Sequence, residues 1–390
     1  MNKKAIAILG AIFLLIVGTL GFLIYSKYAS KASNNPPPPS GNTASSTPQP
    51  PPTPTPNPTP GLGPTPASSQ SAAIYKLTDD QVVSPVLFFN GKGVSYFDRS
   101  GNLLLASFQD NSSPLVFSDK KQLGIPVKTN IAKILWPAKG NDFIAQIKNP
   151  AGGTSWSYFN SGTGAYIDLP PQVQSPDWMP SGQQIMYIWL DNNKATLSLA
   201  NPDATNYKTL ADMWETDDIL NVSPYGDQVL YYENKYSSAT NSINSVTADG
   251  KVWKSLVKNG QNFGALWSPD NQKFLFAKKD ANTQKYQLWI YNLSSGEVKN
   301  LGLATTADKA VWDKDSSVIY AAVPASGTPG ENSLTVDDFV RMDTANLNKK
   351  QYSKTASAVD GRDLFLNSAS DKLFFRNAQD GALYYLDLAQ

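Results

Sequence analysis

The chain has 390 residues, with 33 Lys and Arg against 32 Asp and Glu, and it contains neither His nor Cys. These two absences exclude a Ser-His-Asp triad, a metal site built on His or Cys, a thiolate nucleophile, disulfide bonds and a lipid-modified cysteine. The formal net charge of +1 argues against a nucleic-acid-binding protein that relies on bulk positive charge. With only 4 Glu among the acids, and with 26 Gly and 28 Pro, the composition favours a turn-rich, all-β chain.

The first segment with a clear pattern is an uncharged, apolar run of 21 residues, from Ala5 to Tyr25. As a helix it would span roughly 30 Å, the thickness of a bilayer core. Because Lys3 and Lys4 precede it, we expect residues 1–4 in the cytoplasm, a signal-anchor transmembrane helix over 5–25, and the rest of the chain outside the cytoplasmic membrane. The alternative is a signal peptide cleaved near Ala32, although the run is longer than the usual apolar region of such peptides.

Residues 26–72 form a linker rich in Pro, Thr and Ser. Half of the 28 prolines lie between Ser33 and Ala72, and no charged residue occurs from Ala32 to Tyr75. Such a segment buries little apolar surface, and its prolines restrict the backbone, so we expect an extended spacer. At full extension 40 residues reach at most about 120 Å. Whether its Ser and Thr carry O-glycans is left open.

The remaining residues, 73–390, contain a repeated pattern of four short strands, most clearly in the copy from Ala265 to Gly302. A first strand ends at Trp267, and Ser268-Pro269-Asp270-Asn271 forms a turn in which Pro presets the backbone. The predicted strands that follow are Lys273–Ala277, Tyr286–Leu293 and Val298–Leu301.

The repeat has a period near 44 residues. Its anchor positions are 136, 178, 222, 267 and 312, separated by 42, 44, 45 and 45 residues. Four strands per period at this spacing predict the blades of a β-propeller.

The two ends of the repeat region are less regular. We expect a first blade from Val86 to Phe108, with its fourth strand near 115–117. The last unit, 364–388, has only three strands, and Ile74–Leu77 is expected to complete it and close the ring. Seven blades result, with six as the alternative.

Several turns carry a Trp-Ser-Pro-Asp-like sequence: WSPDN at 267–271, SPYGD at 223–227 and PDWMPSG at 176–182. These repeats resemble those of the TolB-type, WD-repeat-like β-propeller family. The chain departs from the family pattern where Asn271 replaces Gly, where Val222 replaces Trp, and where Trp312-Asp313 lacks Pro. The resemblance implies a propeller that binds other proteins, and it transfers no catalytic residue, because the motif is structural.

The nine tryptophans fall into two groups. Those at the repeat period, Trp136, Trp178, Trp267 and Trp312, are expected to pack between blades. The others, among which we expect an exposed ring, are Trp156, Trp189, Trp214, Trp253 and Trp289.

A candidate binding face holds the connections between blades and the links from strand two to strand three. Trp214 lies beside acids in the connection between the third and fourth blades, and two long polar links follow at 234–241 and 324–333. The candidate ligand-binding residues are Trp214, Glu215, Asp217, Asp218 and Tyr236.

Paired acids are the remaining candidates for chemistry: Asp79-Asp80, Asp217-Asp218, Asp313 with Asp315, and Asp337-Asp338. Such pairs can bind Ca²⁺ or act as a glycosidase acid and base, but none has EF-hand spacing. We therefore expect no catalytic residue, no metal and no cofactor.

The function predicted from the sequence is a non-enzymatic scaffold that binds a protein or a glycan of the cell envelope. The alternative is an envelope glycan hydrolase or lyase that uses Asp pairs, and a third hypothesis is a purely structural surface protein. The expected partners are an envelope protein or glycan and the membrane through residues 5–25, and no nucleic acid.

Overall fold

The structure is a computed structural model that describes residues 73–88, 91–110, 112–213, 218–233, 241–260, 264–279, 285–329, 333–353 and 358–389. The chain divides into two units, Met1–Thr65 and Pro66–Gln390, and every described residue belongs to the second. The predicted segments 1–4, 5–25 and 26–72 lie outside the described residues. Within the described ranges, no helix is both long enough and apolar enough to cross a membrane.

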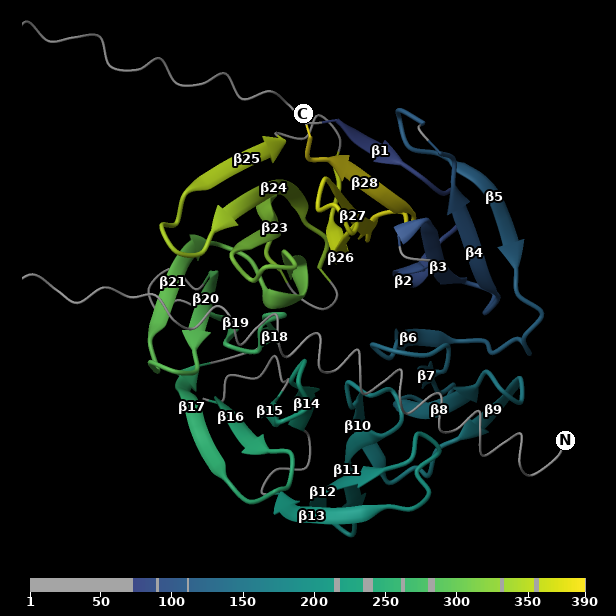
Figure 1. Ribbon diagram of the computed structural model, residues 1–390, viewed down its shortest axis with the longest axis vertical. Helices are drawn as coiled ribbons and strands as arrows, with labels where there is room; N and C mark the ends of the chain where they lie inside the picture. Colours follow the sequence, from purple (N-terminus) through teal and green to yellow (C-terminus); the bar gives the residue numbers. More distant parts are fainter. Residues whose placement is uncertain are drawn as a thin grey trace, which may run out of the picture. The chain divides into compact units, whose positions relative to one another are not determined.

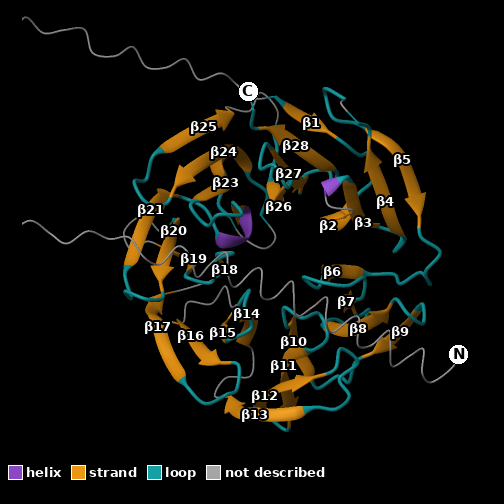
Figure 2. Cartoon of the chain, in the orientation of Figure 1, coloured by secondary structure: helices purple, strands orange, loops and turns teal. Residues whose placement is uncertain are grey.

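The second unit is a ring of seven antiparallel sheets with four strands each (Figures 1 and 2). The first three blades are formed by β2 (Val82–Phe88), β3 (Gly93–Asp98), β4 (Leu103–Phe108), β5 (Phe117–Gln122), β6 (Ile131–Leu135), β7 (Phe143–Lys148), β8 (Thr154–Asn160), β9 (Ala165–Asp168), β10 (Val173–Trp178), β11 (Ile185–Asp191), β12 (Lys194–Ala200) and β13 (Lys208–Met213). The next three are formed by β14 (Asp218–Val222), β15 (Gln228–Glu233), β16 (Asn241–Thr247), β17 (Trp253–Gly260), β18 (Ala265–Trp267), β19 (Lys273–Lys279), β20 (Tyr286–Asn292), β21 (Val298–Leu303), β22 (Ala310–Trp312), β23 (Val318–Ser326), β24 (Val336–Asp343) and β25 (Lys349–Ser353).

The seventh blade joins the two ends of the propeller, as predicted. Its strands are β26 (Gly361–Leu366), β27 (Lys372–Asn377), β28 (Leu383–Asp387) and β1 (Ile74–Lys76). Strand β1 pairs with β28, with Tyr75 opposite Tyr385, and the Leu77 amide donates to the Leu383 carbonyl at 2.8 Å. Closure leaves the outer edge of β28 covered, and the count of seven blades is confirmed over six.

The fourth strand of the first blade was predicted too early. It is β5, which begins at Phe117, rather than a strand near 115–117. The amide of Leu115 donates to the hydroxyl of Tyr385 in the seventh blade at 2.7 Å, so this stretch contacts the neighbouring blade before the strand starts. Pairing with β4 begins only where Phe117 lies opposite Phe108.

The core lies between adjacent blades. Side chains alternate between the two faces of a strand, and both faces of an inner sheet are covered by a neighbouring blade. In β11, for example, Tyr187 packs toward the second blade, whereas Met186 and Ile188 pack toward the fourth. All three are at most 1 % exposed, so the strand is buried on both sides.

The four tryptophans at the repeat period lie between blades, which confirms the prediction. Each indole N–H donates to a backbone carbonyl of the preceding blade's inner strand: Trp136 to Ser84 at 2.8 Å, Trp178 to Leu135 at 2.9 Å, Trp267 to Asn221 at 3.0 Å and Trp312 to Leu266 at 3.3 Å. Each ring therefore fills a gap between sheets and also binds the adjacent backbone.

The turn after Trp267 requires a left-handed backbone at its fourth residue. Asn271 has a φ of 59° there, where the corresponding turns use Gly182 and Gly226, each with a φ of 71°. Asn tolerates this conformation better than most residues. Its side-chain amide also donates to Asp227 in the preceding blade at 3.0 Å. The replacement of Gly by Asn thus keeps the turn and adds a bond between blades.

The fourth blade, where Val222 replaces Trp, is attached differently. The Val222 amide donates to the Asp177 carboxylate at 2.7 Å, and the Leu220 amide donates to the Ser175 hydroxyl at 2.9 Å. Burial raises the pKa of Asp177 to about 6, and the bonds from the Val222 and Trp178 amides only partly offset this effect.

Candidate functional site

Most of the ligand-binding residues proposed from the sequence are not covered by the structure. Trp214, Glu215, Asp217 and Tyr236 lie outside the described residues. Asp218 is described: it begins β14, is only 6 % exposed, and lies opposite Glu233 of β15. The candidate face around these residues therefore stays a prediction.

The link predicted over 324–333 is shorter than expected. Strand β23 continues through Ser326, where Ser326 pairs with Val336, so the link starts at Gly327. Gly327 has a φ of 83°, and a Cβ at this position would come within 2.9 Å of the Leu334 carbonyl. Pro324 lies opposite Asp337 beside a register irregularity, a position at which a strand tolerates proline.

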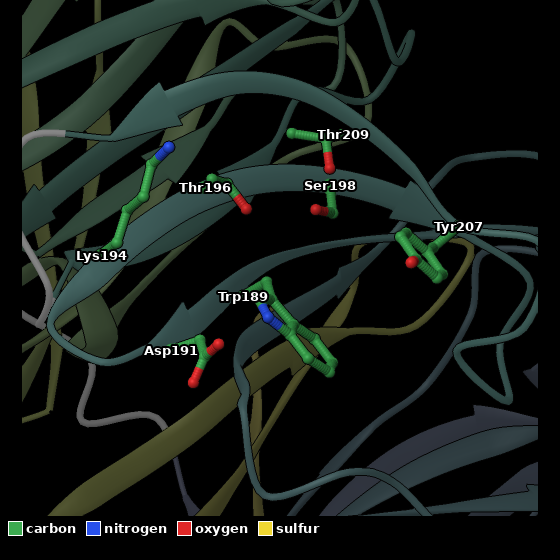
Figure 3. A pocket seen from close by; sticks show the side chains of 7 residues that line it. All are labelled: Trp189, Asp191, Lys194, Thr196, Ser198, Tyr207 and Thr209. Atoms are coloured by element: carbon green, nitrogen blue, oxygen red, sulfur yellow. The ribbon is translucent and has the colours of Figure 1, made fainter.

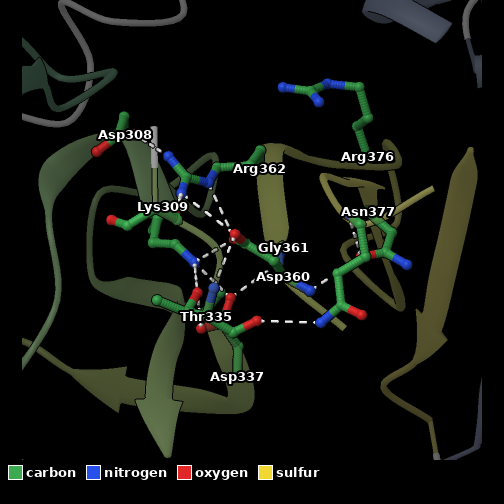
Figure 4. Close-up of polar contacts among 12 residues, drawn as sticks. Asp308, Lys309, Thr335, Asp337, Asp360, Gly361, Arg362, Arg376 and Asn377 are labelled. Carbon is green, nitrogen blue, oxygen red and sulfur yellow. Dashed lines mark hydrogen bonds and ion pairs between the residues drawn. The ribbon is translucent and has the colours of Figure 1, made fainter. Parts of the chain in front are cut away.

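A buried ionic cluster joins the sixth and seventh blades (Figure 4). Lys309 ends the short helix η2 (Ala307–Lys309), and its Nζ lies 2.5 Å from Asp337 and 2.6 Å from Asp360. None of these three side chains is exposed. Lys309 also donates to the Thr335 hydroxyl at 2.8 Å, and Arg362 donates from Nε to Asp360 at 2.9 Å.

The two carboxylates of this cluster find their partners within the fold. Burial would raise the pKa of Asp360, but hydrogen bonds from Arg362 and Lys309 lower it to about 2. Backbone amides of Gly361 and Thr335 complete the coordination of the two carboxylates. Because these groups are satisfied by one another and hidden from solvent, their arrangement serves the contact between blades. No sequence pattern pointed to it, since its members are up to 51 positions apart.

The other described acid pairs are also engaged in local structure. Asp80 accepts from the Tyr96 hydroxyl at 3.0 Å and from Lys120 at 2.6 Å. Asp313 accepts the amides of the turn that follows it. Asp338 accepts from Gln351 on the face of β24 opposite to the buried Asp337. The two members of that pair point away from each other, as neighbours in a strand do.

Within the described ranges, no group of three or more acidic side chains is placed to hold a metal ion. The expected absence of metal, of cofactor and of catalytic residues stays a prediction.

An open groove of about 360 Å³ lies on one face of the third blade (Figure 3). Its lining residues come from β11, β12, β13 and the turn before β13: Trp189, Asp191, Lys194, Thr196, Ser198, Tyr207 and Thr209. The strand register explains their convergence. Trp189 lies opposite Thr196, and Ser198 lies opposite Thr209, so alternate residues of three strands share one face.

The groove exists because the neighbouring blade covers only part of this face. Near the ring centre, Ile185 and Tyr187 are buried against the second blade. Farther along the strand, Trp189 is only partly buried, and Thr209 and Lys194 are exposed.

Two aromatic rings border the groove. The rings of Trp189 and Tyr207 are nearly parallel, at an interplanar angle of 5°, with centroids 6.5 Å apart. Tyr207 is 70 % exposed. An exposed ring was expected among the off-period tryptophans, but the four that the structure describes, Trp156, Trp189, Trp253 and Trp289, are all partly buried. Tyr207 was missed, because a single tyrosine in a polar turn carries no periodic pattern.

The sequence matches no protein-family model and no curated protein. Similar solved structures include an oligogalacturonate lyase from Vibrio parahaemolyticus, at 12 % identity and a TM-score of 0.58, over 82 % of this chain and 94 % of that one. Another is the Swd1 β-propeller domain of Myceliophteria thermophila, at 8 % identity and a TM-score of 0.54, over 80 % and 98 %. TolB from Acinetobacter baumannii matches at 13 % identity and a TM-score of 0.42, over 78 % of each chain.

These likenesses concern the fold. The propeller fold that the resemblance implied is confirmed, since the chain forms seven four-stranded blades and the Swd1 propeller domain is among the similar structures. At these identities a shared fold transfers neither a substrate nor a catalytic residue to this chain.

Proposed function

We propose that this protein is a non-enzymatic binding scaffold of the cell envelope. The propeller is displayed outside the cytoplasmic membrane, on the Pro-rich linker 26–72 that follows the anchor 5–25. It binds an envelope protein or glycan, and the face that holds the blade connections, with Trp214, Tyr236 and the link after β23, is one contact surface. Localisation and partner class are both part of this proposal.

The observation that carries the proposal is a closed, densely packed ring whose described acid pairs are tied into the fold. Lys309 binds two carboxylates between blades, Lys120 and Tyr96 hold Asp80, and Asp313 serves a turn. The described part of the ring presents loops and an open groove to solvent, and loops on a rigid scaffold are where binding residues concentrate.

The alternative, an envelope glycan hydrolase or lyase that uses Asp pairs, has less support. Two reacting carboxylates must face one substrate bond at a set separation. Asp337 and Asp338 point to opposite faces, and Asp80 is held by Lys120. The pair Asp217-Asp218, of which Asp217 lies outside the described residues, is the one through which the enzyme alternative can be tested. Turnover of an envelope glycan that is abolished by Asp217→Asn with Asp218→Asn would favour it over the scaffold.

The binding face is tested by pull-down of the full chain from detergent-solubilised membranes. We expect an envelope component that is retained by the wild type and lost by a variant carrying Trp214→Ala and a shortened 327–333 link. The matched control is Tyr225→Ala, which removes an exposed tyrosine, 67 % accessible, from the β14–β15 turn of the opposite ring face. Equal recovery by all three proteins would contradict the proposed face.

The topology is tested by cysteine labelling, because the native chain has no Cys to interfere. Lys314→Cys places one thiol in the exposed β22–β23 turn, and Lys3→Cys places one before the anchor. A membrane-impermeant maleimide added to intact cells should label the first and spare the second. The reverse pattern would place the propeller in the cytoplasm and overturn the localisation.

A further inference from the structure

We propose that the groove of the third blade, bordered by Trp189 and Tyr207, is a binding site for uncharged pyranose units of a glycan chain. The inference rests on the proposed scaffold function and deepens it by assigning a ligand class to a site away from the blade-connection face. The combination that carries it is two parallel aromatic rings and two accessible threonine hydroxyls on one open face of a rigid sheet.

The lining matches both sides of a pyranose ring. A sugar presents an apolar C–H surface, which packs on aromatic rings, and a rim of hydroxyls, which need hydrogen-bond partners. Trp189 and Tyr207 supply the rings, while Thr196 and Thr209 supply accessible hydroxyls that both donate and accept. Ser198 lies buried at the floor, where its side chain is hydrogen-bonded to Tyr187. The indole N–H of Trp189 donates no hydrogen bond to any described residue, unlike those of the four tryptophans between blades.

The charges favour an uncharged ligand. Asp191 and Lys194 stand at one end of the groove, and Lys194 lies 3.3 Å from Asp212, so the site has no net positive charge to attract an anion. Residues 73–390 carry 29 Lys and Arg against 32 Asp and Glu, a net charge of −3. A polyanionic glycan would therefore be repelled rather than drawn in.

The groove also suits a sugar better than an extended peptide. Its floor is the face of the sheet, where the backbone groups of β11 and β12 are already bonded to neighbouring strands. A peptide that adds to a sheet needs a free edge, which this face does not offer. The volume of about 360 Å³ is near the lower end of the range for small-molecule sites, about 300–1,000 Å³. It fits a short stretch of a chain that continues into solvent at the rim.

The exposed ring is held in place before any ligand binds. Tyr207 follows a turn in which Asp203 accepts from both the amide and the hydroxyl of Thr205, at 3.0 and 2.6 Å. Ala204 and Asn206 both have positive φ, at 62° and 51°, so the turn is tightly wound. The Tyr207 ring itself stacks on that of Trp189. Because the backbone is fixed by the turn and the ring already has this stacking partner, ordering the ring on binding costs little, which favours affinity.

The test is titration of the detergent-solubilised full chain with three tetrasaccharides, followed by calorimetry and tryptophan fluorescence. The uncharged probes are the tetramers of N-acetylglucosamine and of glucose, and the anionic probe is tetragalacturonate. We expect saturable binding of at least one uncharged tetramer and no binding of tetragalacturonate.

Variants locate the site. Tyr207→Ala should weaken binding about tenfold or more, Tyr207→Phe should retain it because the ring remains, and Tyr225→Ala is the matched control that should leave it unchanged. Failure of both uncharged tetramers to bind, binding of tetragalacturonate alone, or binding insensitive to Tyr207→Ala would overturn the inference.

The outcome is distinguishable from failure of the scaffold proposal. If the blade-connection face captures its partner while no sugar binds at Tyr207, the scaffold stands and the glycan site is wrong. If sugar binds at Tyr207 and the labelling experiment places the propeller in the cytoplasm, the glycan site stands and the envelope location is wrong.

Discussion

Two contacts between neighbouring blades solve the same problem with different chemistry. Between the fourth and fifth blades, Trp267 fills the gap and donates to the Asn221 carbonyl, and Phe274 packs edge-on against it at 5.8 Å. Between the sixth and seventh blades, Lys309 occupies the gap and binds Asp337 and Asp360 without any exposure to water. One contact is apolar with a single polar bond, whereas the other is ionic.

The difference shows what a blade contact requires. Both contacts fill the space between two twisted sheets and supply a partner to polar groups that water does not reach. The indole does this with one donor. The ionic contact needs several mutually satisfied charges, so removing one of them leaves the others buried and unpaired. We therefore expect the ionic contact to be the more fragile of the two.

The largest effect is expected from breaking the ionic contact. Lys309→Met keeps a similar length but removes the charge, leaving two buried carboxylates facing each other and Arg362. We expect the free energy of unfolding to fall by about 3–5 kcal/mol, measured by urea denaturation. Lys314→Met, at an exposed position, is the control and should change it little. A loss below 1 kcal/mol at Lys309 would refute the idea that this contact is held by charge.

A smaller effect is expected from the indole contact. Trp267→Phe preserves an aromatic ring but loses the bond to Asn221 and some packing, for an expected loss of about 1–3 kcal/mol. The comparison variant is Trp253→Phe, because the Trp253 indole donates within its own blade, to the Gly250 carbonyl at 3.0 Å. If Trp253→Phe costs as much, the effect of Trp267 does not come from joining blades.

The pH dependence of the free energy of unfolding should reveal the effect of a third kind of contact, that of Asp177 with the fourth blade. Its pKa in the fold, about 6, is above the ordinary value of 3.8, so the group stabilises the fold at low pH. This contribution is complete below about pH 4 and is lost as the pH rises through 6. Asp177→Asn should remove a change of about 1–3 kcal/mol between pH 4 and pH 7. Asp110→Asn, an exposed position, is the control in denaturation series at several pH values.

The pKa of Asp360 is shifted in the opposite direction, so its contribution to stability has the opposite pH dependence. Its pKa in the fold is about 2, below the ordinary 3.8, so its contribution is complete above about pH 4 and is lost as the pH falls toward 2. Between pH 6 and pH 4, acid should therefore relieve the cost of the buried Asp177 charge and leave the ionic contact intact. The ionic contact should weaken only as the pH falls from about 4 toward 2. Acid unfolding that begins anywhere other than the sixth and seventh blades, followed by amide hydrogen exchange, would contradict this order.

The smallest effect is expected at the turn residue Asn271. Asn271→Gly suits the positive φ of the turn but removes the bond to Asp227, and these two effects nearly cancel. We expect a change of less than about 1 kcal/mol in the free energy of unfolding. Asn271→Ala, which loses the bond and strains the backbone, should cost more than Asn271→Gly, and the reverse order would show that the backbone does not matter there.

Local sequence patterns were sufficient for most of the fold. The strands around Trp267 were predicted within two residues, because alternating apolar side chains and a Pro-containing turn are local features. Closure by Ile74–Leu77 was predicted because the last unit lacked a strand, and Ile74–Lys76 forms that strand. The start of β5 was misplaced, since a contact with Tyr385, 270 positions away along the chain, decides it.

The candidate sites, in contrast, could not be predicted from local sequence patterns. The sequence suggested Trp189 as one of several off-period rings, but nothing in it joined this ring to Tyr207. The two are brought together by the register of β11, β12 and β13, which places the turn before β13 beside Trp189. Likewise, the pairing of Lys309 with Asp360 spans 51 positions.

The sequence by itself determined the period of the repeat, the four strands in each blade, the tryptophans between blades and the closing strand. The strands and turns follow from side-chain alternation and turn chemistry over fewer than about ten residues, and the period and the closing strand follow from the recurrence of this local pattern along the chain. Tertiary structure alone decided which blade contacts are ionic, how strongly Asp177 and Asp360 hold their protons, and where a groove stays open. These properties depend on distances and on water exclusion between segments far apart in the chain, which a linear pattern does not encode.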